Sequence, residues 1–133
     1  AALTRFYDAI LYIEQPLDRQ VALAPDQEKA IRGVAALKPI IIDESDGDLN
    51  SFREALALGY TGVSTKNCKG IIKAVANQGL ARVFSTETET PCFLTGEDLM
   101  NLPVVPLHQD LTHVALIDQK FDLIQTLGII RHV

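Results

Sequence analysis

Short apolar runs alternate with helical patterns along this chain, and that alternation restricts the fold more than any other feature. The expected strands cover residues 10–13, 39–42, 62–65, 82–85 and 103–107. The expected helices cover residues 25–37, 48–59, 69–78 and 111–127, with a short one starting at Thr95. Strands separated by helices pair in parallel, because a parallel connection needs a long crossover. The sequence therefore predicts an α/β fold with a parallel sheet.

The expected helices carry residues that start and stop helices. Pro25 suits a first turn, Asp48 can cap the second helix, and Gly59 and Gly79 can end the second and third. The residues expected to face inward are Leu49, Phe52 and Leu56, then Ile72, Val75 and Ala76, and finally Leu111, Val114, Phe121, Ile124 and Leu127.

Composition excludes several classes of protein. The 133 residues are 47% hydrophobic and 22% charged, as in one ordinary globular domain. The formal net charge of -5 argues against nucleic-acid binding, which needs a basic face. The apolar runs are too short to span a bilayer, and no secretory signal is visible. Cys68 and Cys92 are isolated from each other, so we expect two reduced thiols in a cytoplasmic protein.

Two architectures are compatible with this pattern. One is an open, doubly wound sheet, and the other is part of a (β/α)8 barrel, which needs about 250 residues when complete. No glycine-rich phosphate loop follows any expected strand, which weakens the nucleotide-binding form of the open sheet. In both architectures, ligands bind at the carboxyl ends of the strands.

Polar residues follow nearly every expected strand. They are Glu14, Asp43 with Glu44, Lys66, then Ser85, Thr86 and Glu87, and finally His108. Acids at successive strand ends suit Mg²⁺, which prefers oxygen ligands. A lysine near such a cation has its ammonium form disfavoured and can act as a base. The alternative is that these residues are solvated loop acids and a surface lysine.

Three segments resemble a known family when they are taken together. They are YIEQPL (12–17), PIIIDES (39–45) and GVSTKNCKG (62–70). Their order and spacing resemble the catalytic barrel of the enolase superfamily, in its mandelate racemase and muconate-lactonising branch. The resemblance implies strands four to eight of a (β/α)8 barrel. The amino-terminal capping domain and the first barrel strands would then lie outside this chain.

The same resemblance implies roles for individual residues. Glu14 and Asp43 correspond to Mg²⁺ ligands, Glu44 to an acid beside them, and Lys66 to the acid/base catalyst. His108 is a candidate for a catalytic or substrate-contacting group at the end of the eighth strand. Lys69 and Glu87 are candidates for charged pocket residues near substrate. His113 is expected on the last helix, with no role assigned.

The implied reaction begins with loss of the proton next to a substrate carboxylate, which produces an enediolate. Racemisation, epimerisation, cycloisomerisation and dehydration share this step, with acid sugars among the substrates. The alternative function is a non-catalytic α/β module whose strand-end acids are solvated or structural. We further expect the isolated chain to be inactive and to associate, either with itself or with the missing amino-terminal part, because five strands cannot close an eight-stranded barrel.

Overall fold

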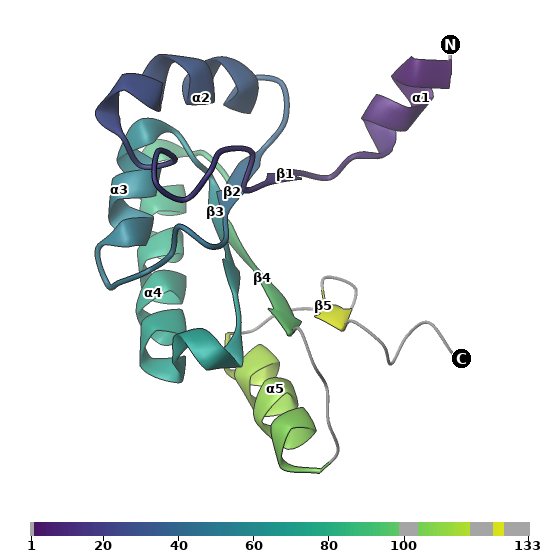
Figure 1. The fold of residues 1–133 in the computed structure, drawn as a ribbon, viewed down its shortest axis with the longest axis vertical. Helices are drawn as coiled ribbons and strands as arrows, with labels where there is room; N and C mark the ends of the chain where they lie inside the picture. The colour runs from purple at the N-terminus through teal and green to yellow at the C-terminus, as the bar shows by residue number, and fades with distance from the viewer. Residues whose placement is uncertain (1, 99–103, 118–123, 127–133) are drawn as a thin grey trace. The chain divides into compact units, whose positions relative to one another are not determined.

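The computed structural model describes residues 2–98, 104–117 and 124–126, in which helices alternate with parallel strands (Figure 1). The chain divides into two compact units, Ala1–Gly62 and Val63–Val133. The predicted α/β class with parallel pairing is confirmed in each unit. In the described part of the chain, no helix combines the length and apolar character needed to span a lipid bilayer.

The first unit contains one parallel strand pair and the helices around it. Its elements are α1 (Ala2–Ala9), β1 (Ile13–Glu14), the 3-10 helix η1 (Pro25–Gln27), α2 (Glu28–Ala35), β2 (Ile40–Ile42) and α3 (Ser51–Leu58). Ile13 lies opposite Ile40 and Glu14 opposite Ile41. All of β2 is buried, as expected for a strand covered on both faces. The strand predicted at 10–13 starts only at Ile13.

Helices α2 and α3 pack against each other, and α2 also contacts β2. Ile31 of α2 is buried, as are Phe52 and Leu56 of α3. The prediction that Leu49 faces inward is wrong, because α3 begins two residues after it and leaves it exposed. Asp48 does support the helix start, since its Oδ1 accepts a hydrogen bond of 3.0 Å from the Ser51 N–H.

Gly59 ends α3 as predicted. Its φ is 107°, and its N–H donates to the carbonyls of Ala55 and Leu56, both at 3.1 Å. An L-residue rarely adopts such a φ, because its Cβ approaches the neighbouring carbonyl. A Cβ at Gly59 would also come within 2.7 Å of Arg32 Cγ, although that side chain can move.

Replacing Gly59 tests this account of the helix end. We expect Gly59→Ala to lower the free energy of unfolding by about 1–2 kcal/mol, mostly because of backbone strain. Gly33→Ala is the matched control in α2, because nothing lies within 4 Å of a Cβ there. It should raise the free energy of unfolding by roughly 0.5–1 kcal/mol. Urea unfolding of both variants checks this, and equal effects of the two substitutions would contradict it.

Among its described residues, the second unit contains three strands and two longer helices. Its elements are β3 (Gly62–Thr65, whose first residue belongs to the first unit), the 3-10 helix η2 (Asn67–Lys69), α4 (Ile71–Thr88), β4 (Phe93–Asp98), α5 (Val105–Leu116) and β5 (Ile124–Thr126). Strand β4 lies between β3 and β5. It pairs in parallel with β5, with Gly96 opposite Ile124. The strand predicted at 62–65 is confirmed.

The strand predicted at 82–85 is wrong, because α4 continues through Gly79 to Thr88. One glycine inside a helix costs only about 1 kcal/mol, and packing of α4 on β4 outweighs it. The predicted inward face is also wrong. Ile72 is 79% exposed, and Val75 and Ala76 are exposed with it. The buried residues of α4 are Lys73, Ala74, Asn77 and Ala81.

In the carboxyl-terminal part of the chain, the structure has a strand where a helix was predicted and a helix where a strand was predicted. The helix expected to start at Thr95 is β4, and the strand expected at 103–107 is the first turn of α5 from Val105 onward. Pro106 suits that first turn. The helix predicted at 111–127 is correct to Leu116 and wrong at β5. Val114 is buried as predicted and Leu111 is exposed. Pro103, Phe121 and Leu127 lie outside the described residues.

The two cysteines are free thiols, as predicted, but they differ in environment. Cys68 is exposed, whereas Cys92 is partly buried just before β4. Burial raises the pKa of the Cys92 thiol to about 12, although a hydrogen bond with the Phe93 backbone acts in the opposite direction. Cys92 therefore carries almost no thiolate, the reactive form, at neutral pH.

Alkylation rates test this difference. At pH 8, we expect iodoacetamide to modify Cys68→Ser, which retains only Cys92, at least about tenfold more slowly than Cys92→Ser. In the folded protein, modification of Cys92 should accelerate as the pH rises toward its raised pKa of about 12. In urea both variants should react alike. Equal rates in the folded state would contradict the burial of Cys92.

Candidate metal and acid–base residues

Glu14 and Asp43 come together at the carboxyl ends of neighbouring parallel strands. Glu14 is the last residue of β1, and Asp43 directly follows β2. One carboxylate oxygen of each lies within 4.8 Å of the other. Asp43 is buried and Glu14 is half-buried. The predicted convergence of these two acids is therefore a feature of the first unit.

The backbone of the strand pair produces this convergence. The Ile13 N–H donates to the Pro39 carbonyl at 2.8 Å, and the Gln15 N–H donates to the Ile41 carbonyl at 2.9 Å. These bonds set the parallel register of β1 and β2, so that the residues after both strands lie at the same, carboxyl-terminal edge of the strand pair. A turn follows β2 at once, where the Asp46 N–H donates to the Asp43 carbonyl at 2.9 Å.

Two carboxylates this close suit a hard cation. Each would donate oxygen, the atom that Mg²⁺ prefers, at about 2.1 Å from the ion. Two such bonds span up to roughly 4.2 Å. The 4.8 Å limit on the Glu14–Asp43 oxygen separation thus permits sharing of one ion with small side-chain movements. Without a cation, two neighbouring carboxylates repel each other.

Glu44 lies beside this pair but faces outward. It is exposed and lines an open pocket of about 420 Å³ in the first unit. The other lining residues are Gln15, Pro16, Leu17, Asp18 and Arg19, which follow Glu14 in the chain. The pocket thus combines both signs of charge at the edge where Glu14 and Asp43 lie.

Lys66 follows β3 directly, at the carboxyl end predicted for it. Its ammonium group forms an ion pair with Glu97 of β4, and the two side chains are only 9% and 11% exposed. This carboxylate stabilises the charged form of Lys66. Lys69 turns back toward the same strand, where its Nζ donates to the Ser64 carbonyl at 2.9 Å.

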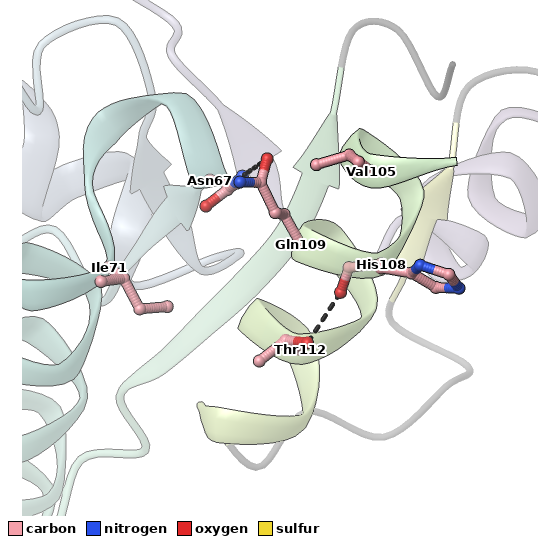
Figure 2. Close-up of a pocket in the computed structure, with 6 residues that line it drawn as sticks. All are labelled: Asn67, Ile71, Val105, His108, Gln109 and Thr112. Carbon is pink, nitrogen blue, oxygen red and sulfur yellow. Dashed lines mark hydrogen bonds between the residues drawn. The ribbon is translucent and has the colours of Figure 1, made fainter. Parts of the chain in front are cut away.

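His108 and Glu87 do not lie at strand ends. His108 is an exposed residue of α5, because residues 105–107 form a helix and not the expected strand. Its ring extends away from Asn67 and Ile71 (Figure 2). Glu87 is an exposed residue of the last turn of α4, together with Thr86. The predicted strand-end positions of both residues are wrong.

Figure 2 shows the second unit's pocket, of about 350 Å³, to which His108 contributes. Its lining residues are Asn67, Ile71, Val105, His108, Gln109 and Thr112. Two of its lining residues form a long, exposed hydrogen bond, in which Asn67 Nδ2 donates to Gln109 Oε1 at 3.4 Å. Lys66 is not among its lining residues.

Sequence reasoning missed two polar residues of these sites, Gln15 and Glu97, and assigned no role to His113. Gln15 lies next to Glu14 and bonds the loop after β2. Glu97 pairs with Lys66 from within β4, where Thr95 and Gly96 separate it from the apolar residues Phe93 and Leu94, so no acid directly after an apolar run marked it in the sequence. His113 lies on α5 as predicted and is buried, with its Nε2 at 3.1 Å from Thr65 Oγ1.

Comparisons with protein family models, with curated proteins and with solved structures give no match for this chain.

The Lys66–Glu97 pair can be tested by removing its charges one at a time. We expect Glu97→Gln to lower the free energy of unfolding by about 3 kcal/mol, because it removes a carboxylate from beside the Lys66 ammonium group in a nearly buried place. The double variant Lys66→Met/Glu97→Gln, in which both charges are gone, should be more stable than Glu97→Gln alone. Urea unfolding of the full double-mutant cycle measures the coupling. Additive effects would contradict a coupled pair.

Proposed function

We propose that this chain belongs to a Mg²⁺-dependent enzyme of the enolase superfamily that removes the α-proton of a small carboxylate substrate. The observation that carries the proposal is the closeness of the Glu14 and Asp43 carboxylates at the ends of β1 and β2. The three sequence segments named above support it. The barrel architecture and its strand numbering are part of the proposal.

In this proposal each residue has a defined task. Glu14 and Asp43 hold the ion through their oxygens. When bound, Mg²⁺ supplies positive charge that stabilises the second negative charge of an enediolate. Lys66, as a neutral amine, accepts the α-proton while the C–H electron pair moves into the enediolate. The proposal requires Lys66 to reach substrate that is bound at Glu14 and Asp43.

The ion pair with Glu97 adds a condition to this mechanism. It favours the ammonium form of Lys66, which can donate a proton but cannot accept one. Lys66 must therefore lose a proton before it can act as the base. In the reverse direction, or in the second half of a racemisation, the ammonium form is the competent one.

The same ion pair favours a second candidate function. A lysine paired in a nearly buried place can be purely structural, as in a non-catalytic α/β module. In such a module, Glu14 and Asp43 would be structural or solvated acids. The two functions differ in whether the chain binds Mg²⁺ and in whether Lys66 moves a proton.

Metal titration tests the first difference. We expect Mg²⁺ to bind, and Glu14→Gln and Asp43→Asn each to weaken binding by at least about tenfold, because each removes a charged oxygen ligand. Asp18→Asn is the control, since Asp18 is an exposed acid in the neighbouring loop. Isothermal titration calorimetry provides the measurement. Equal losses in all three variants would indicate a general charge effect and contradict a site at Glu14 and Asp43.

Proton exchange in D₂O tests the second difference. With a panel of polyhydroxy carboxylates and Mg²⁺, we expect deuterium at the α-carbon with the complete barrel enzyme that this proposal implies, and none with its Lys66→Met variant. The Lys66→Met/Glu97→Gln variant separates chemistry from folding, because it also removes the partner charge. Normal exchange by a folded variant without Lys66 would show that another group is the base.

A further inference from the structure

The side chain of Gln15 joins the two loops that carry the candidate metal ligands. Its Oε1 accepts hydrogen bonds from the backbone N–H of Asp43 at 2.7 Å and of Ser45 at 3.2 Å. Its Nε2 donates to the Leu17 carbonyl and to Ser45 Oγ, both at 2.7 Å. One carboxamide thus bonds the loop after β1 to the loop after β2.

The backbone of Gln15 is unusual at the same point. Its φ is 41°, and among the described residues it is one of two non-glycine residues with a positive φ. A residue before proline normally adopts an extended conformation, and Pro16 follows here. A backbone conformation of this kind persists only where surrounding contacts hold it. The contacts that hold Gln15 are its own side-chain hydrogen bonds and its N–H bond to the Ile41 carbonyl.

We propose that Gln15 is the positioning residue of the Glu14–Asp43 pair. It follows Glu14 in the chain and fixes the peptide N–H of Asp43, so it connects both carboxylates through one rigid group. It does not touch the ion itself. This inference rests on the proposed function, because positioning matters here only if the pair binds a cation.

The four hydrogen bonds at this position require a carboxamide on a side chain as long as that of glutamine. The site needs an acceptor for two N–H groups and a donor for a carbonyl and a hydroxyl. Methionine has a similar length but supplies neither function. Glycine relieves the positive φ but also removes the side chain. Comparing Gln15→Met with Gln15→Gly therefore separates the hydrogen bonds from the backbone conformation.

Mn²⁺ binding followed by electron paramagnetic resonance tests the inference. We expect the native chain to bind Mn²⁺, and Gln15→Met and Gln15→Gly both to bind it at least about tenfold more weakly. Gln20→Met is the matched control in the same loop, where Gln20 is exposed, and it should bind as the native chain does. Circular dichroism confirms that each variant is folded.

A milder variant covers the case in which both Gln15 substitutions unfold the chain. Ser45→Ala removes one of the four bonds and should weaken Mn²⁺ binding about threefold or more, with faster hydrogen exchange at the Asp43 amide. If Gln15→Met is folded and binds Mn²⁺ as the native chain does, the positioning role is overturned. If the Gln15 variants unfold, native-like Mn²⁺ binding by Ser45→Ala overturns it instead. Either result leaves the proposed function intact. No binding by the native chain overturns the proposed function, and the inference with it.

Discussion

The parallel hydrogen bonding between β1 and β2 is the constraint on which the first unit depends. Parallel strands run in the same direction, so the residues that follow them emerge at the same edge. The hydrogen bonds from Ile13 to Pro39 and from Gln15 to Ile41 fix the register of the two strands, so that β1 and β2 end at the same height. Parallel pairing also requires a crossover, which α2 supplies while it covers β2 and contacts α3. The approach of Glu14 to Asp43 is a direct consequence of this pairing.

The sequence predicted the first unit well because local and tertiary signals agree there. Strand β2 is a continuous apolar run, as a strand buried on both faces should be, and Pro25 and Gly59 mark real helix boundaries. The positions of Glu14 and Asp43 followed from the same rule, since each acid comes directly after apolar residues. Lys66 in the second unit directly follows Ser64 and Thr65, and it was located as the residue after the strand predicted at 62–65.

The errors in the second unit come from polar or small residues on buried faces. Helix α4 buries Lys73, Ala74, Asn77 and Ala81 while it exposes Ile72 and Val75, so the apolar stripe predicts the wrong face. Once Gly79 is taken as a helix end, every later boundary shifts, and His108 moves from the expected strand end to a helix. Hydrophobic periodicity cannot find such a helix, because tertiary packing and not apolar content determines its orientation.

The supporting residues of the candidate site were harder to find than its ligands for a related reason. An acid that follows an apolar run departs from the local pattern and is visible in the sequence. Gln15 and Glu97 act through partners that are distant in the chain, Ser45 and Lys66, and many surface positions carry the same residue types. Glu97 and Gln15 differ, however, in backbone conformation. Glu97 lies within a regular strand, whereas Gln15 has a positive φ before a proline, a combination that local preferences oppose. Since that conformation is maintained by bonds to the loop of Asp43, the strain at Gln15 and the placement of Asp43 depend on the same carboxamide.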